Sequence, residues 1–366
     1  MNIFEERLST IRQKLDEWEV DGVLIGSDSN RRWLSGFTGS SGQLLITPDA
    51  AIIATDSRYF EQAQNEAPAF TLFKHRRTKE DNQKLFETAG VAKIGVEAQY
   101  TTLAAMSQLR KIEGVEWKPL PRTVEPLRQL KTEAELRQIR AAAELTDYTM
   151  SQVNQLARPG QTEQELAWEL EKTMREAGAD TTAFTIIVAS GPNSALPHHR
   201  PGDRVLTLGD PIIIDMGAQL GGYNSDMTRT FYLGDGPSDQ FWQVYNLVLG
   251  AQTAVFFHLR PDANCKAVDK VARDIIHNAG HEEHFGHGLG HGVGLDVHEG
   301  PRLSPLADEE ATLAAGMVVT IEPGVYIPGW GGVRIEDLVV ITPTGFRRLS
   351  LCPKLPIIPI IPICNS

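Results

Sequence analysis

The sequence has few cysteines and no cluster of them. Its three cysteines, Cys265, Cys352 and Cys364, are scattered along the chain, and no CxxC pair occurs. An odd, dispersed set of thiols is typical of a reducing compartment, and it excludes a cysteine-based zinc site. The sequence therefore predicts a cytoplasmic protein in which any metal ion must be held by other ligands.

Long apolar runs and blocks of basic residues are also missing. No stretch is long and apolar enough to cross a bilayer, and the charged N-terminus, MNIFEERLSTIRQKLDEWEVDG, lacks the apolar region of a signal peptide. The formal net charge is -12, and lysine and arginine form no cluster. Nucleic acids and anionic membranes both require such clusters, so neither is an expected partner.

The length of 366 residues allows two domains, each with its own core. Over residues 1–125, short apolar runs alternate with helical stretches, which is typical of a small α/β domain. Residues 126–366 are expected to be α+β with mainly antiparallel strands, and the prolines between 119 and 126 mark the boundary. The expected helices of this second domain cover 132–156, 162–177, 240–259 and 264–280, and the expected strands 184–189, 211–216, 226–233, 317–321 and 333–342.

A stretch rich in glycine and histidine, GHGLGHGVGLDVHE, extends from Gly286 to Glu299. Glycine occupies every second position from 286 to 294, and a period of two favours an extended chain over a helix. Glycines at this spacing allow another backbone or an ion to come close. In an extended chain His287 and His291 share one face, while His298 points the other way. The stretch therefore predicts one wall of a site.

Two aspartates flank a predicted hairpin. Asp215 ends an Ile-Ile-Ile run, and Asp226 follows eleven residues later. A loop of Leu220-Gly221 puts the two directly opposite each other, whereas a loop of Gly221-Gly222 offsets them by one diagonal step. Either way their Cβ atoms lie roughly 4.5–8 Å apart. Two solvated turn acids are the simpler alternative, but a carboxylate at the end of a buried strand needs a partner or a metal ion.

Two glutamates lie in β-rich runs farther along the chain. Glu322 ends one run, and in the next the alternation of a strand puts Arg334 and Glu336 on one face and Asp337 on the other. Taken singly, each glutamate could equally be a solvated surface charge. Two aspartates, two glutamates and a histidine, with no thiolate, suit Mn²⁺, Co²⁺, Fe²⁺ or Zn²⁺. Four carboxylates carry more charge than one divalent ion neutralises, so we expect two ions bridged by carboxylates and a water.

These segments resemble the motifs of the M24, or pita-bread, metallopeptidases, a family that includes methionyl aminopeptidase, prolidase and aminopeptidase P. DMGAQLGGYNSDMTRTF, HGLGHGVGLDVHE, TIEPGVYI and GVRIEDLVVIT match the family's motifs in order, while RRWLSGFTGSSGQLLIT and TDSRYFEQA resemble its creatinase-type N-terminal domain. The resemblance implies an α+β protein of two domains, a small α/β creatinase-like domain over 1–125 and a pita-bread catalytic domain over 126–366.

The resemblance also implies five metal ligands, Asp215, Asp226, His291, Glu322 and Glu336. Asp226 and Glu336 would bridge two divalent ions, for which Mn²⁺ is favoured over Co²⁺, Zn²⁺ and Fe²⁺. The remaining glutamate, Glu322, would also act as the general base for the bridging water.

Three histidines and an arginine acquire roles from the same resemblance. His198 would contact the substrate, His287 would line the pocket for the proline ring, and His298 would stabilise the tetrahedral intermediate or protonate the leaving amine. Arg334 would support the site by hydrogen bonding or contact the substrate. The neighbouring His199 is expected to occupy a surface turn.

The activity that the resemblance implies is that of an Xaa-Pro aminopeptidase, a homodimer acting on proline-containing peptides. Prolidase is the alternative, and His198 or Arg200 could then bind the free carboxylate of a dipeptide. The additional N-terminal domain disfavours methionyl aminopeptidase. The intact carboxylates disfavour two rivals of other classes, a metal-free creatinase-like hydrolase and a binding module that has lost its ligands.

The C-terminal tail departs from the family pattern. After Cys352-Pro353-Lys354 comes LPIIPIIPICNS, in which three prolines exclude both a helix and a central strand. We assign the tail no function, and it lies outside the five expected ligands.

Overall fold

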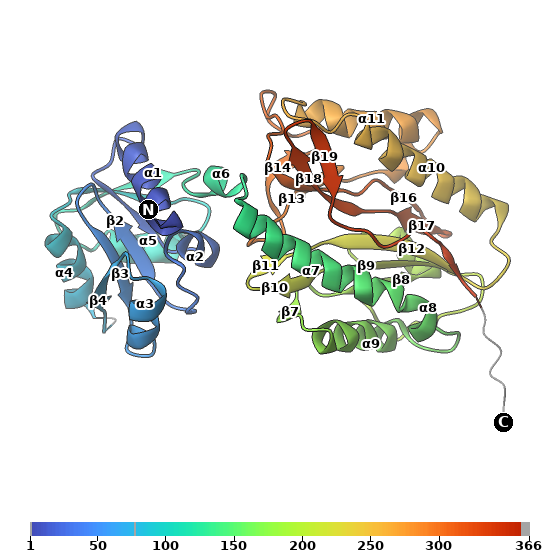
Figure 1. The fold of residues 1–366 in the computed structure, drawn as a ribbon, viewed down its shortest axis with the longest axis horizontal. Coiled ribbons are helices and arrows are strands. Elements are labelled where there is room, and N and C mark those ends of the chain that lie inside the picture. Colours follow the sequence, from blue (N-terminus) through green and yellow to red (C-terminus); the bar gives the residue numbers. More distant parts are fainter. Residues whose placement is uncertain (1, 77, 360–366) are drawn as a thin grey trace. The chain divides into compact units, whose positions relative to one another are not determined.

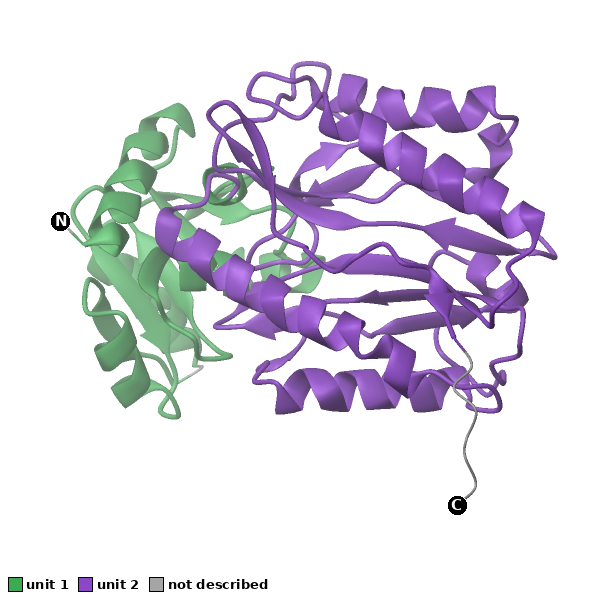
Figure 2. Ribbon diagram, turned by 45° about the vertical axis from the view of Figure 1, so that its right-hand side comes forward, with its two compact units in different colours: residues 1–128 green, residues 129–366 purple. Residues whose placement is uncertain are grey.

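The structure is a computed structural model that describes residues 2–76 and 78–359. Figure 1 shows the element order, and the chain divides into two compact units, Met1–Arg128 and Gln129–Ser366, which are coloured separately in Figure 2. Within the described ranges, no helix is long and apolar enough to cross a membrane.

The first unit is built on a six-stranded sheet of order β4-β3-β2-β1-β5-β6. Strand β2 is antiparallel to both of its neighbours, and the remaining pairs are parallel. Strand β1 is fully buried, as its apolar sequence predicts. The strands are β1 (Gly22–Ile25), β2 (Gln43–Ile46), β3 (Ala51–Thr55), β4 (Thr71–Lys74), β5 (Lys93–Glu97) and β6 (Glu116–Leu120), and the helices are α1 (Ile3–Glu17), α2 (Asp28–Ser35), α3 (Phe60–Glu66), α4 (Lys79–Ala89), α5 (Leu103–Leu109) and α6 (Glu125–Arg128).

The helices of the second unit begin where the sequence predicts. Thr132 and Thr162 each form a capping box with the glutamate three residues on, and the side chain of Asn264 caps another helix. The single helix expected over 132–156 is in fact two, because Gln152 separates them. The helices are α7 (Glu133–Ser151), α8 (Val153–Leu156), α9 (Glu163–Glu176), α10 (Asp239–Phe256) and α11 (Cys265–Asn278), with 3₁₀ turns η1 (Gly191–Ala195) and η2 (Glu282–His284).

The strands of the second unit form four sheets, of orders β11-β10-β7, β20-β12-β9-β8, β14-β13-β15-β18-β19 and β16-β17. Helix α9 packs on the second of these, and α10 and α11 share a core with the third and fourth. The strands are β7 (Thr181–Thr182), β8 (Ile187–Ser190), β9 (Pro211–Met216), β10 (Ala218–Leu220), β11 (Tyr223–Asn224), β12 (Met227–Leu233), β13 (Gly290–Gly292), β14 (Glu299–Leu303), β15 (Val318–Ile321), β16 (Gly324–Ile327), β17 (Gly331–Arg334), β18 (Asp337–Thr342), β19 (Gly345–Arg348) and β20 (Ile357–Ile358).

The strand expected over 333–342 is broken, and this break corrects the expected geometry. Strand β17 ends at Arg334, β18 starts at Asp337, and the chain between them passes from the two-stranded sheet into the five-stranded one. Glu336 therefore lies in the break and does not share a strand face with Arg334. The chain makes the reverse passage between β15 and β16, where Glu322 lies.

Within the glycine-rich stretch, only β13 and the first residue of β14, Glu299, belong to strands, and β13 lies between β14 and β15. His287 lies outside the strand that carries His291, so the two do not share a strand face as expected. A Cβ atom on Gly290 would lie 2.0 Å from the carbonyl oxygen of Thr320, and one on Gly292 would lie 2.1 Å from that of Gly300. No side chain fits at either position. These two glycines thus admit neighbouring backbone and not an ion.

The described part of the C-terminal tail forms an edge strand. Strand β20 pairs in parallel with β12 at the margin of its sheet, as expected for a proline-rich segment. Residues 360–366 lie outside the described part of the chain.

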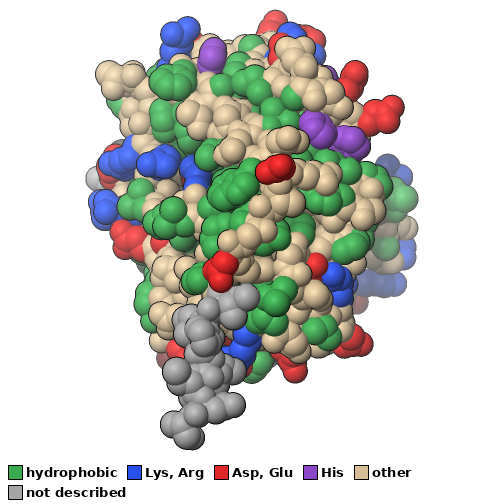
Figure 3. Space-filling model, turned by 90° about the vertical axis from the view of Figure 1, so that its right-hand side faces the viewer, with side chains coloured by type: hydrophobic (Ala, Val, Ile, Leu, Met, Phe, Trp, Pro, Cys, Tyr) green, Lys and Arg blue, Asp and Glu red, His purple; other side chains and the backbone are tan. Residues whose placement is uncertain are grey.

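On the face of the molecule in Figure 3, acidic and basic side chains are scattered among apolar ones.

Candidate metal centre

The β9–β12 hairpin positions the two aspartates. Asp215 pairs with Thr228, and Leu220 pairs with Tyr223, so the connecting loop is Gly221-Gly222. Both glycines have a positive φ, 56° and 79°, a backbone conformation that residues with a side chain rarely adopt. Of the two registers that the sequence allows, the structure therefore has the diagonal one.

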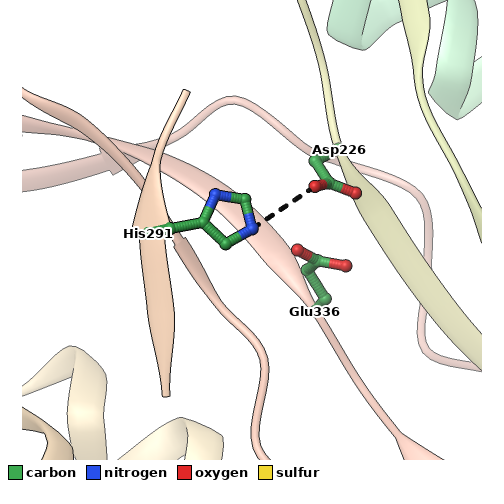
Figure 4. Close-up of side chains that lie close together, drawn as sticks. All are labelled: Asp226, His291 and Glu336. Atoms are coloured by element: carbon green, nitrogen blue, oxygen red, sulfur yellow. Dashed lines mark ion pairs between the residues drawn. The ribbon is translucent and has the colours of Figure 1, made fainter. Parts of the chain in front are cut away.

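The predicted ligands come together from the hairpin, from β13 and from the two strand breaks. Asp226, His291 and Glu336 each offer a ligand atom, and these three atoms lie within 4.8 Å of one another (Figure 4). The His291 Nε2 atom is 3.6 Å from Asp226 Oδ2 and 3.2 Å from Glu322 Oε1. The charge of Asp215 acts on both Asp226 and Glu336. The structure thus gathers all five expected ligands in one place.

The ring of His291 is oriented as a metal ligand requires. Its Nδ1 atom lies 3.1 Å from the carbonyl oxygen of Gly292. A carbonyl can only accept, so Nδ1 carries a proton in this contact and Nε2 is the ring nitrogen that faces Asp226 and Glu322. Burial opposes a charge on the ring, but the hydrogen bond and charge of Glu322 outweigh it and raise the pKa of His291, so without a metal ion Nε2 donates to Glu322. A backbone carbonyl that fixes the tautomer in this way is the usual partner of a metal-binding histidine.

Burial and like charges shift the pKa values of the carboxylates. Burial raises the pKa of Asp226 and of Glu336 well above the ordinary range, and the neighbouring carboxylates raise both further. Burial also opposes ionisation of Glu322, yet the hydrogen bond and charge of His291 outweigh it and lower the pKa of Glu322 to about 2. The cluster therefore holds one carboxylate whose ionisation His291 favours beside others whose ionisation burial and like charge oppose.

Two buried oxygens show what the cluster requires. Asp215 Oδ1 and Glu336 Oε1 have no hydrogen-bond partner among the described residues. A buried polar atom without a partner costs free energy, and a divalent cation would supply the partner that both oxygens need. Carboxylate oxygens with one imidazole nitrogen suit Mn²⁺, Co²⁺, Fe²⁺ or Zn²⁺, so the residues present fit such ions.

Arg334 supports the carboxylates from inside the protein. It is 3% exposed, and its Nη2 donates to Asp215 Oδ2 at 2.7 Å while its Nε donates to Thr228 Oγ1 at 3.0 Å. Thr228 in turn donates to Glu336 Oε2 at 2.7 Å. Of the two roles expected for Arg334, hydrogen bonding to the site therefore fits its position better than contact with a substrate.

His287 joins this network through Tyr326. Its Nδ1 donates to the Gly288 carbonyl at 2.7 Å, so its Nε2 accepts from the Tyr326 hydroxyl at 2.9 Å. The same hydroxyl oxygen accepts from Arg334 Nη1 at 2.8 Å. Burial lowers the pKa of His287, which keeps the ring neutral for this contact. The sequence does not mark Tyr326, because Glu322 lies in the break between β15 and β16 and no strand period relates the two residues.

His298 and His198 face the same space. The ring of His298 lies 4.3 Å from that of His291 between centroids. Burial and then His291 lower the pKa of His298, and the charge of the exposed His198 lowers the pKa of both His298 and His287. The segment that carries His198 also contacts the site, because the Pro197 carbonyl accepts from Arg334 Nη1 at 3.4 Å.

His199 does not occupy a simple surface turn, which corrects the expectation for it. Its Nε2 lies 2.7 Å from Oε2 of Glu163, whose side chain is fully buried at the start of α9. Glu163 also accepts hydrogen bonds from the backbone and hydroxyl of Ser190 and from the side chain of Asn193. This carboxylate therefore anchors the segment that carries His198.

Known proteins resemble the chain over nearly its whole length. Residues 137–343 match the family described as metallopeptidase family M24, and residues 7–130 match the creatinase/prolidase N-terminal domain. The "Uncharacterized peptidase YqhT" of Bacillus subtilis is 40% identical over 95% of this chain and 98% of its own. A solved Xaa-Pro dipeptidase from Bacillus anthracis is 37% identical, with a TM-score of 0.94 over 98% of this chain and 100% of that one. A solved X-Pro aminopeptidase from Thermotoga maritima is 34% identical, with a TM-score of 0.86 over 95% and 100%.

Proposed function

The chain belongs to metallopeptidase family M24, and we propose that it is a dinuclear metal-dependent Xaa-Pro aminopeptidase. It would remove the N-terminal residue from peptides whose second residue is proline. The observation that carries the proposal is the buried cluster of four carboxylates and His291, in which Asp215 and Glu336 each have an oxygen without a partner among the described residues.

The residues of the cluster have distinct tasks in this proposal. Divalent ions held there would lower the pKa of water and polarise the scissile carbonyl. Asp226 and Glu336 would bridge the ions, with the other three ligands completing the set. Glu322 would hold the attacking water and accept its proton. His298, beside His291, would donate a hydrogen bond to the developing oxyanion or a proton to the leaving nitrogen.

The preference for proline follows from the surrounding histidines. An imide nitrogen has no N–H group, so a proline ring leaves no donor unpaired when it enters a pocket. In the proposal His198 contacts the substrate and His287, held by Tyr326, forms a wall of the pocket. The free amine of the peptide would lie against the carboxylates, which limits cleavage to the N-terminal residue.

An Xaa-Pro dipeptidase is the second candidate, and one observation favours it. Arg200 is exposed, and within the described ranges no hydrogen bond or ion pair occupies its guanidinium. A free guanidinium near His198 suits the terminal carboxylate of a dipeptide. The related structures carry both names, since one is called an Xaa-Pro dipeptidase and another an X-Pro aminopeptidase.

The experiment that separates the candidates compares substrates that differ only after the proline. Protein stripped of metal with a chelator and reloaded with Mn²⁺ is assayed on Xaa-Pro and on Xaa-Pro-Zaa. Preferential cleavage of the tripeptide supports the aminopeptidase, whereas preference for the dipeptide, lost in Arg200→Ala, supports the second candidate. Equal activity of wild type and Asp226→Ala would show that the metal centre takes no part in the reaction.

The finer properties belong to the same proposal. We favour Mn²⁺ as the native ion, a homodimer as the assembly and the cytoplasm as the location. Nucleic acids and membranes are not proposed as partners, in keeping with the net charge of -12. Metal analysis of protein purified without chelator and a sedimentation experiment test the first two.

A further inference from the structure

A buried amide on α10 contacts the backbone beside both glutamate ligands. Gln252 is 0% exposed, and its Nε2 atom donates to the carbonyl oxygens of Ile321, at 2.9 Å, and of Ile335, at 3.1 Å. These isoleucines directly precede Glu322 and Glu336. We infer that Gln252 is a positioning residue that sets the spacing of the two glutamates and thereby the affinity for the metal ions.

The Gln252 amide lies where the chain passes between the five-stranded and the two-stranded sheet. At Glu322 the chain leaves the five-stranded sheet for the two-stranded one, and at Glu336 it returns. Neither glutamate belongs to a strand, but each backbone N–H is bonded, that of Glu322 to the Leu289 carbonyl at 2.8 Å and that of Glu336 to the Thr228 carbonyl at 3.1 Å. Between the two crossings the Ile335 N–H donates to the Pro323 carbonyl at 3.4 Å, and Gln252 adds its two hydrogen bonds to this contact. A single donor that binds one carbonyl at each crossing holds the two crossings at a fixed separation.

The surroundings of Gln252 indicate that packing alone does not require it. Helix α10 lies against β16 and β17 (Figure 1), and its neighbouring buried residues Val248, Ala251 and Val255 are apolar. A polar side chain in such a core costs free energy unless its groups are bonded, and Gln252 Oε1 has no partner among the described residues. An apolar residue would fill the same volume without that cost. The two hydrogen bonds of Nε2 are therefore the reason for an amide here.

The inference rests on the proposed metal centre, but its test does not depend on peptidase activity. Gln252→Met keeps the length of the side chain and removes the donor. Gln252→Asn keeps the amide but is one methylene shorter, so it can reach at most one of the two carbonyls. Val255→Ala is the matched control, because it weakens the packing of the same helix in the same core without touching either carbonyl.

Each protein is stripped of metal, titrated with Mn²⁺ in a calorimeter and unfolded by heat. We expect Gln252→Met to bind Mn²⁺ about 10–100-fold more weakly, as for other residues that orient metal ligands, with Gln252→Asn in between. Val255→Ala should bind Mn²⁺ like the wild type despite a lower unfolding temperature.

Wild-type Mn²⁺ affinity in Gln252→Met would overturn the inference, as would a loss of affinity in Val255→Ala that follows its loss of stability. If Gln252→Met does not fold, a folded Gln252→Asn variant with wild-type Mn²⁺ affinity would also overturn the inference. A wild-type protein that binds Mn²⁺ but cleaves no Xaa-Pro peptide would count against the proposed function and leave the role of Gln252 intact.

Discussion

At the scale of single residues, the carboxylates of the cluster were predictable and the residues that support them were not. Carboxylates that end apolar runs, such as Asp215, are costly without a partner, so the sequence alone marks them. Tyr326, Thr228 and Gln252 carry no such mark, because their roles arise from contacts with segments far away in the chain. Those contacts exist only once the fold has formed.

Asp226→Asn tests the crowding of negative charge in the cluster. Burial and the neighbouring carboxylates disfavour ionisation of Asp226, so the amide should leave the metal-free protein at least as stable as the wild type. The same change removes one of the proposed metal ligands, and we expect Mn²⁺ affinity to fall by more than about 100-fold, beyond the effect of losing a supporting residue. Thermal unfolding of the stripped protein and calorimetric titration measure the two effects. If the stripped variant is less stable than the stripped wild type, the expected repulsion between the carboxylates is contradicted.

Tyr326→Phe tests the link between Arg334 and His287. The change leaves a buried ring nitrogen and a guanidinium group short of a partner, which should cost about 1–3 kcal/mol of unfolding free energy. Activity on Xaa-Pro-Zaa should fall, with a change in KM if His287 lines the proline pocket. Tyr245→Phe is the control, since Tyr245 is buried in the same unit and no hydrogen bond occupies its hydroxyl within the described ranges. Equal effects of the two changes would exclude a specific role for Tyr326.

At the scale of elements, local signals located most helices and strands. The capping boxes at Thr132 and Thr162 depend on residues three apart, so the sequence displays them directly. The break between β17 and β18 was not predictable, because the apolar run continues through Ile335 without a turn residue. It forms because the chain joins two different sheets, which is a tertiary constraint. That constraint places Glu336 in the site.

Glu163→Gln tests how the segment with His198 is anchored. Burial opposes ionisation of Glu163, but hydrogen bonds from His199, Ser190 and Asn193 outweigh it and lower its pKa. A lowered pKa contributes stability that is complete above the unfolded value, roughly 4.3, and is lost as the pH falls through the folded value. The variant should therefore be less stable than the wild type at pH 7, with the gap narrowing below about pH 4.3.

Urea unfolding at several pH values measures this gap. KM for the peptide should rise in the variant more than kcat falls, because in the proposed function the anchored segment contacts substrate. Glu176→Gln is the control, since Glu176 lies exposed at the other end of the same helix. A gap that does not depend on pH would show that the charge of Glu163 is unimportant.

At the scale of the whole molecule, the two-domain fold and the family were predictable from ordered motifs. The match to family M24 over 137–343 and to the creatinase/prolidase domain over 7–130 confirms both. The choice between dipeptide and longer substrates was not predictable. It depends on which positively charged side chains lie where the carboxylate of the proline, or the residue after it, would bind. In the proposal, the exposed Arg200 would make that choice.

Metal binding should couple the stability of the second unit to pH. In the stripped protein the raised pKa values of Asp226 and Glu336 mean that stability is complete below roughly pH 4 and falls as the pH rises through the folded values. Metal ions require both groups deprotonated, so Mn²⁺ affinity should rise over the same range and binding should release protons. At a free Mn²⁺ concentration of 1,000 times its Kd, the gain in unfolding free energy should be about 4 kcal/mol. Calorimetric titration in two buffers of different ionisation enthalpy counts the protons. Identical heats in both buffers would mean that the carboxylates are already ionised in the stripped protein, and would overturn the electrostatic account of the cluster.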